Sequence, residues 1–254
     1  MKIAVLGAGN VGALLAKAFA AAGHDVTIAN SRGPETLAEL AAKLGVRAAY
    51  AADAVKGAET VVTSVNPRSY ASIRPILESV PEDVPVIDTG NYHPLRDGKI
   101  DAMEEGQVEA LWISEQLGRP VTKAWNAVLA QTLEEAAVPA GTPGRIALPI
   151  AGDDPAAKRV AAGLVDDSGF DAVDIGGLEN TWRVQPGTPA YCTELPEAAL
   201  REAVDRADAS QAPVLRDLAW EAFRTFGDDL NRENVVRFHR AMTRTPDPRG
   251  VVSR

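Results

Sequence analysis

The chain opens with a short hydrophobic run and then changes to a helical spacing of its apolar residues. Residues 3–6 form an apolar stretch of the length expected for a buried strand of a parallel sheet. After a glycine-rich turn, the apolar positions recur with a helical period, which predicts a helix that Gly23 closes in a left-handed conformation. The helical stripe consists of Val11, Leu14, Leu15, Ala18, Phe19 and Ala22. A strand, a glycine loop and a helix in this order are the first half of a βαβ unit.

The alternation of strands and helices continues to about residue 180. Further apolar or β-branched runs predict strands at residues 26–29, 50–51, 60–65, 84–88, 121–125, 145–151 and 170–175. Helices are predicted at residues 34–44 and 70–77, and another begins after Asp154, with Pro155 at its first position. This order predicts an α/β fold of the Rossmann type, with a doubly wound, mostly parallel sheet. We assign residues 1–180 to an NAD(P)-binding domain with an extended sheet.

The pattern changes after Leu178. Prolines and a glycine make residues 182–192 irregular, and helices are predicted near residues 196–209, 214–226 and 231–242. The middle helix has an apolar face made of Val214, Leu215, Leu218, Ala222 and Phe226. Residues 181–254 therefore form a small C-terminal helical part, a lid or an extension.

The glycine loop has the spacing of a dinucleotide-binding site. In such a loop Gly7 allows the tight turn, Gly9 lets the backbone approach the pyrophosphate, and Gly12 lets the helix pack against the strand. The N-terminus of the helix offers free N–H groups and a partial positive charge to phosphates. The predicted cofactor contacts of this loop are Gly7, Ala8, Gly9, Asn10, Val11 and Gly12.

The end of the second strand indicates which dinucleotide is preferred. NAD enzymes usually have a carboxylate here for the adenosine ribose, but this chain has Asn30, Ser31 and Arg32. A guanidinium and a hydroxyl suit a 2′-phosphate, which predicts NADP(H). The alternative is that Arg32 is simply an exposed arginine in a turn.

Other loops at the carboxyl edge of the sheet are candidates for the rest of the site. Val65, Asn66 and Pro67 are expected to border the nicotinamide half of the cofactor. Residues 89–94 contain polar and aromatic groups suited to a substrate, although Gly-Asn and His-Pro are also typical of an ordinary turn.

Composition narrows the class of protein. The 254 residues are 46% hydrophobic and carry a net charge of −9, which disfavours nonspecific binding to nucleic acid or to a membrane surface. A single cysteine, Cys192, excludes an internal disulfide. The three histidines are scattered, so we predict no metal site. These features fit a cytoplasmic enzyme with a small-molecule substrate, and a homodimer is compatible with them.

The usual catalytic motifs are missing. The chain has no Tyr-x-x-x-Lys, HExxH or GxSxG motif. The remaining candidates are Tyr92, Lys123, Asn126 and Tyr191. Each has a plain alternative: Tyr92 in an ordinary turn, Lys123 at a strand edge, Asn126 in a turn after a core Trp125, and Tyr191 in a loop without substrate contact.

Several motifs together resemble a known family. GAGNVG at residues 7–12, the turn at 30–32, KAWN at 123–126 and LPIAGDD at 148–154 occur in this order. Over residues 1–180 the chain resembles the F420-dependent NADP oxidoreductase family. The resemblance implies an NADPH-binding Rossmann domain, a small C-terminal part over the hydride-accepting site, and coenzyme F420 or a flavin as hydride partner. The chain departs from the family after Gly177, where it has a longer helical extension.

We therefore expect an NADPH-dependent oxidoreductase. A deazaflavin or flavin ring accepts hydride with little help from a protein acid, so the missing motifs favour such an acceptor. A small carbonyl or imine compound is the alternative acceptor. An alternative of another class is a non-catalytic NADPH sensor.

Overall fold

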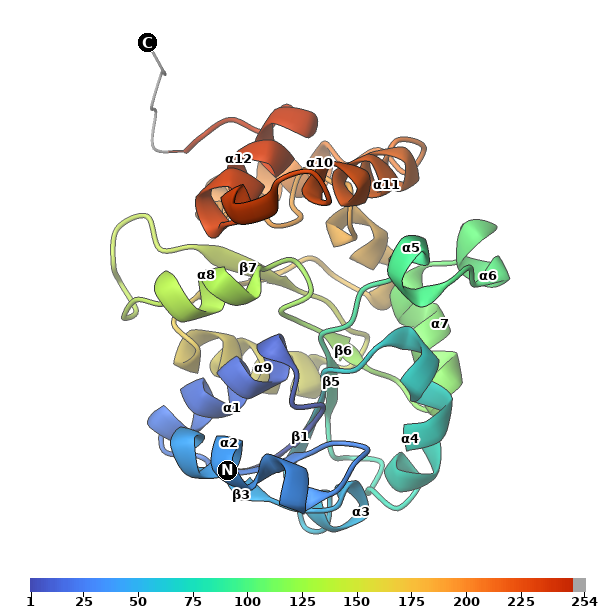
Figure 1. Cartoon of the computed structure of the whole chain (residues 1–254), viewed down its shortest axis with the longest axis vertical. Helices are drawn as coiled ribbons and strands as arrows, with labels where there is room; N and C mark the ends of the chain where they lie inside the picture. The colour runs from blue at the N-terminus through green and yellow to red at the C-terminus, as the bar shows by residue number, and fades with distance from the viewer. Residues whose placement is uncertain (249–254) are drawn as a thin grey trace.

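The computed structural model describes residues 1–248 and contains a six-stranded parallel sheet (Figure 1). The strand order is β3-β2-β1-β4-β5-β6. The strands are β1 (Lys2–Leu6), β2 (Asp25–Ala29), β3 (Arg47–Ala48), β4 (Thr60–Thr63), β5 (Val86–Asp88) and β6 (Thr122–Lys123). The order reverses between β1 and β4, and in such sheets ligands bind at this switch point, outside the carboxyl ends of the strands. The predicted fold class is confirmed.

Helices cover both faces of the sheet (Figure 1). They are needed because successive side chains of each strand point to opposite faces, so apolar side chains lie on both. On one face, α1 (Asn10–Ala21) and α2 (Ala38–Leu44) share a core with Ile3 and Val5 of β1. On the other, α4 (Tyr70–Leu77) and α7 (Glu109–Leu117) pack over Ala4 and Leu6. Because each chain crossover returns to the amino end of the next strand, the N-termini of α1, α4 and α7 lie near the carboxyl edge.

A second, two-stranded sheet extends the domain. Strands β7 (Ala147–Ile150) and β8 (Asp171–Asp174) pair in parallel and are joined by α9 (Pro155–Asp167). The Asp154 side chain caps α9 by accepting the Ala156 N–H. An antiparallel bridge between Lys123 and Ala151 connects the two sheets. The expected extended sheet is thus divided into two.

Some predicted boundaries were wrong. The strand expected at residues 50–51 lies earlier in the chain, as β3 at Arg47–Ala48. Ala51–Ala54 forms the short helix α3. The strand expected at 121–125 stops at Lys123 because Trp125 turns the backbone with φ of 56°. The connections between the strands also contain short helices. They are η1 (Pro34–Leu37), η2 (Pro67–Ser69), α5 (Pro94–Asp97), α6 (Asp101–Glu104) and α8 (Ala130–Glu135).

The C-terminal part lies over one end of the Rossmann domain (Figure 1). It contains η3 (Leu178–Val184), α10 (Glu197–Asp205), α11 (Ala212–Phe223), η4 (Gly227–Asp229) and α12 (Arg232–Met242). Leu195 and Leu200 pack with Ala147 and Val173, so this part shares a core with the second sheet. Its last residues, 249–254, lie outside the described residues.

The apolar stripe predicted on α11 does not face the core. Val214 and Leu218 are 62% and 53% exposed, whereas Ala212, Arg216 and Ala219 are buried. None of the helices in residues 1–248 combines the length and hydrophobicity of a membrane span.

Candidate functional site

The three loop glycines have different roles in the structure. Gly7 has φ of +109°, and a Cβ there would lie 2.0 Å from the Ser64 carbonyl oxygen. A Cβ on Gly12 would lie 2.0 Å from the Gly7 carbonyl oxygen. No described atom lies within 4 Å of a Cβ built on Gly9. The fold itself therefore requires Gly7 and Gly12, while Gly9 is required only if something outside the chain occupies that space.

The open position at Gly9 coincides with the N-terminus of α1. Gly9 is the N-cap residue, and no side chain in residues 1–248 caps this helix. Ala8 and Val11 pack against the core below, whereas Gly9 and Asn10 are exposed. The first N–H groups of the helix are thus accessible beside an open backbone, which is the geometry of a phosphate site.

The turn after β2 is held by the Asn30 side chain. Its Oδ1 accepts the Arg32 N–H at 2.9 Å, and its Nδ2 donates to Thr36 Oγ1 at 2.9 Å. Ser31 and Arg32 are exposed, and Arg32 makes no ion pair within the described chain. Nearby, the Tyr50 hydroxyl donates to Glu35, and this hydrogen bond lowers the pKa of the Glu35 carboxyl. The Arg32 guanidinium is therefore available for an external anion.

The end of β4 lies beside the glycine loop. The Ser64 N–H donates to the Leu6 carbonyl at 2.8 Å, which joins the ends of β4 and β1. Val65 is half-buried, Asn66 is exposed, and Pro67 is buried as the first residue of η2. The structure thus brings residues 65–67 to the switch point with the loop at residues 7–12.

A buried ion pair fixes the loop after β5. Thr63 and Tyr70 donate their hydroxyls to Asp88 Oδ2 at 2.7 Å each, and the Gly90 N–H donates to Oδ1 at 3.0 Å. Lys123 donates to Asp88 Oδ1 and to the Gly90 carbonyl, with its side chain 2% exposed. Burial and the Asp88 charge raise the pKa of Tyr70 well above its ordinary value. Lys123 is therefore a positioning residue for the loop.

Asn126 links this loop to the C-terminal part. Its carbonyl accepts from Asn91 Nδ2 at 2.7 Å, and its own Nδ2 donates to the Val184 carbonyl at 3.0 Å. Its buried Oδ1 has no hydrogen-bond partner among the described residues. Trp125 belongs to the core, where it packs edge-on against Phe19.

Tyr92 and Glu109 meet beside the same loop. The Tyr92 N–H donates to Glu109 Oε2 at 3.0 Å, and the Tyr92 hydroxyl donates to Glu104 at 3.0 Å. The Arg216 guanidinium of α11 lies 5.2 Å from the centre of the Tyr92 ring. Glu109 is 5% exposed, and burial raises its pKa to about 7, against the lowering effects of Lys123 and the Tyr92 N–H.

These side chains line a cavity of about 230 Å³ between the two parts of the chain. The Rossmann part contributes Tyr92 and Glu109, and the C-terminal part contributes Trp182, Gln185 and Arg216. A perturbed carboxyl in a small cavity at the carboxyl edge is a feature of functional sites. Neither Glu109 nor Arg216 was predicted from the sequence. A glutamate in the first turn of a helix normally only interacts favourably with the helix dipole, and an arginine in a helix is normally exposed.

Tyr191 lies in a neighbouring cluster. Its ring is 5.4 Å from that of His239, and burial raises its pKa well above the ordinary value. His93 packs on Trp220 at 5.1 Å, and burial together with the Arg96 charge lowers its pKa to about 3. Tyr191 and His93 thus contact the C-terminal helices rather than the predicted phosphate loop.

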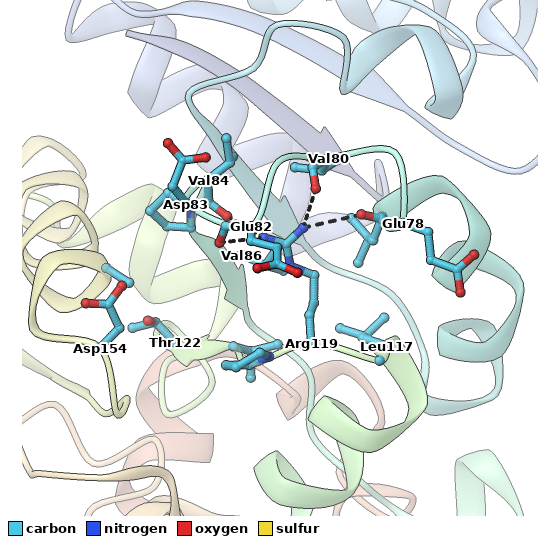
Figure 2. Close-up of a pocket in the computed structure, with 16 residues that line it drawn as sticks. Glu78, Val80, Glu82, Asp83, Val84, Val86, Leu117, Arg119, Thr122 and Asp154 are labelled. Atoms are coloured by element: carbon cyan, nitrogen blue, oxygen red, sulfur yellow. Dashed lines mark hydrogen bonds between the residues drawn. The ribbon is translucent and has the colours of Figure 1, made fainter.

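A larger cavity, of about 540 Å³, lies at the opposite end of the sheet (Figure 2). There Arg119 donates to the carbonyls of Val80 and Val84 at 3.0 and 2.8 Å. These hydrogen bonds pair backbone carbonyl groups of the segment between α4 and β5. Its lining residues come from the segments that enter β5 and β6, from the ends of α4 and α7, and from the start of α9. Ligands of open α/β sheets bind at the carboxyl ends, so this cavity is not the cofactor site.

Comparisons with known proteins agree with this geometry. Residues 2–92, which include the glycine loop and the ends of β2, β4 and β5, match the family described as NADP oxidoreductase, coenzyme F420-dependent. The chain is 33% identical over 105 residues to the putative protein YjhV of Escherichia coli (strain K12). The matched residues are 41% of this chain and 77% of YjhV.

Two solved structures are similar over most of their length. The hypothetical protein SMa0349 from Sinorhizobium meliloti is 32% identical with a TM-score of 0.63, over 75% of this chain and 93% of that one. A "putative F420 dependent NADP-reductase" from Arthrobacter sp. FB24 is 27% identical with a TM-score of 0.56, over 71% of this chain and 87% of that one. With the glycine loop and the parallel sheet described above, these matches show that the chain belongs to the family of coenzyme F420-dependent NADP oxidoreductases.

Proposed function

We propose that this protein is an NADPH-dependent oxidoreductase that reduces a small carbonyl or imine compound. The observation that carries the proposal is the open position at Gly9, beside the uncapped N-terminus of α1. A Cβ at Gly9 would fill the space that a pyrophosphate needs, while the fold itself would tolerate it. The membership in an NADP oxidoreductase family supports the same cofactor.

Arg32 supports NADPH over NADH. The Asn30 turn presents the Arg32 side chain without an ion pair to any described residue, so a 2′-phosphate would gain a charge-assisted hydrogen bond. When bound, NADPH would supply the hydride. The chain would hold its phosphates at residues 7–12 and 30–32, with residues 65–67 beside the nicotinamide half.

The lining of the Glu109 cavity favours an acceptor that must be protonated. The cavity of about 230 Å³ contains a buried carboxyl beside Gln185, which suits the small polar group of a carbonyl or imine compound. The C-terminal part also encloses this position through Gln185 and Arg216. A deazaflavin or flavin remains the second candidate, because the family match points to coenzyme F420.

The test is to mix the protein with NADPH and separate acceptors and to follow the nicotinamide absorbance. We use a cyclic imine, a small ketone, a deazaflavin and a flavin, with Gly9→Ala as the control that lacks the pyrophosphate position. We expect turnover with a small acceptor and loss of NADPH binding in the variant. Preference for the deazaflavin would overturn the small acceptor. NADPH binding without turnover of any acceptor would indicate a sensor.

A further inference from the structure

The cavity at Glu109 contains polar atoms that the chain leaves unsatisfied. Gln185 Nε2 is buried and has no hydrogen-bond partner in the described chain. Buried polar groups are normally paired, because an unpaired one costs about 1–3 kcal/mol. Glu109 accepts the Tyr92 N–H with Oε2, and its Oε1, which is not one of the buried unpaired atoms, accepts no hydrogen bond from a described residue. A bound molecule with an acceptor would pair with Gln185 Nε2, and a polar nitrogen or oxygen on the same molecule would pair with Glu109 Oε1.

The charges around the cavity favour a ligand that becomes positive. Arg216 is already paired with Asp217 at 2.7 Å and approaches Glu104 at 3.5 Å. These two carboxylates offset its charge, so an anionic ligand would gain little and would face Glu109. Tyr92 and Trp182 line the same cavity, and their rings already hold the guanidinium groups of Arg216 and Arg183 at 5.2 and 4.5 Å.

We infer that this cavity binds a small compound with a carbon–nitrogen double bond, and that Glu109 donates a proton to its nitrogen. The inference rests on the proposed function, which supplies NADPH as the hydride donor. Hydride forms the new C–H bond, and the π-electron pair moves to nitrogen. Nitrogen takes the proton as the Glu109 O–H bond breaks, so the products are an amine, NADP⁺ and a Glu109 carboxylate. Water then returns the proton to Glu109.

Gln185 has a second role in this arrangement. Its Nε2 would donate to a polar atom of the substrate, which fixes the orientation of the double bond. Because Gln185 follows η3 and Arg216 lies in α11, the substrate site is complete only when the C-terminal part is in place. Gln185 therefore determines binding, and Glu109 determines proton transfer.

The proton affinity of Glu109 suits this role. Its pKa of about 7 leaves a large protonated fraction at neutral pH. Charged or titratable groups act on it from every neighbouring element. They are Asp88 of β5, Lys123 of β6, Tyr70 of α4, Arg216 of α11, and Tyr191 and Arg96.

The experiment compares Glu109→Gln with Glu115→Gln, an exposed position on the same helix. The substrate is a five-membered cyclic imine that carries a carboxamide group, whose oxygen is the acceptor for Gln185. The corresponding cyclic amine, with the same carboxamide, is the probe for the cofactor-free protein. Glu109→Gln should lower kcat about 10²–10⁴-fold and remove the fall in rate above about pH 7, while the Kd for NADPH stays unchanged. Glu115→Gln should behave as the parent.

Difference infrared spectroscopy provides a readout without turnover. Adding the amine to the cofactor-free parent should remove a protonated-carboxyl band, and Glu109→Gln should lack this signal. Gln185→Leu, a second variant, should weaken amine binding and raise KM about tenfold with the infrared band retained.

The outcomes separate the two proposals. If the parent binds no NADPH but the amine still changes the infrared band, the proposed function fails and the site remains. If the parent reduces the imine and Glu109→Gln keeps its kcat and pH profile, the inference fails and the proposed function stands. Reduction of a ketone but not of the imine would overturn the substrate class.

Discussion

Glu109→Gln is also a direct test of how burial affects this carboxyl, whatever the substrate is. Gln has nearly the same shape as a protonated Glu, and its amide oxygen can still accept the Tyr92 N–H. The substitution therefore removes the ionisation and leaves the packing.

The magnitude follows from the pKa. Folding raises the pKa of Glu109 from its ordinary 4.5 to about 7, so the folded protein binds an extra proton between these pH values. This contribution to stability is fully present below about pH 4.5 and is lost as the pH rises through about 7. At 1.4 kcal/mol per tenfold change in proton concentration, the difference is about 3 kcal/mol.

The assay is urea unfolding of parent and variant at about pH 5 and about pH 8. We expect similar stability near pH 5, and a variant that is more stable by about 2–4 kcal/mol near pH 8. His93 and His239 titrate in both proteins, so the difference between them isolates Glu109. Equal pH dependence of the two proteins would show that Glu109 ionises freely, and the argument from burial would be refuted.

Other substitutions test separate parts of the site. Arg32→Ala should weaken NADPH binding about 10–100-fold and leave NADH binding unchanged, as calorimetry with both cofactors would measure; equal losses would contradict a 2′-phosphate contact. Gly9→Ala should unfold like the parent but lose NADPH, whereas Gly12→Ala should lose about 1–3 kcal/mol of stability because its Cβ meets a loop carbonyl; equal stabilities in urea would contradict this. Lys123→Met should cost about 3–5 kcal/mol by leaving a buried carboxylate unpaired, and unchanged urea unfolding would show that the pair is not structural. Burial lowers the pKa of His239 to about 4, so its contribution to stability is present above about pH 6.5 and is lost as the pH falls through about 4. In acid unfolding, His239→Leu should therefore lose up to about 3 kcal/mol less stability than the parent as the pH falls.

The parts of the fold that local sequence determines were predictable. The strand at residues 3–6, the glycine loop and α1 follow from neighbouring residues alone, because the turn has no room for a side chain at Gly7 or Gly12. The strand order is the one typical of the predicted dinucleotide-binding fold. The short strands were less predictable: β3 pairs over only two residues, so register rather than composition decides where it lies.

The C-terminal helices could not be oriented from their hydrophobic pattern. Val214 and Leu218 have the spacing of a buried stripe, yet the buried face of α11 includes Arg216. The reason is that Arg216 packs its guanidinium over the Tyr92 ring and pairs with acidic residues on both sides. A cation that finds such partners is buried by tertiary contacts, which periodicity does not describe.

The same long-range packing creates the candidate catalytic group. Glu109 starts α7, where sequence alone indicates an exposed residue that interacts with the helix dipole. Gln185 and Arg216, far along the chain, line the same cavity. Burial raises the pKa of Glu109, against the lowering effect of the Arg216 charge. An acid suited to neutral pH therefore arises from the way two parts of the chain meet, and no short motif encodes it. Tyr-Lys or His motifs do not include this group, whereas its burial beside a cavity makes Glu109 a candidate.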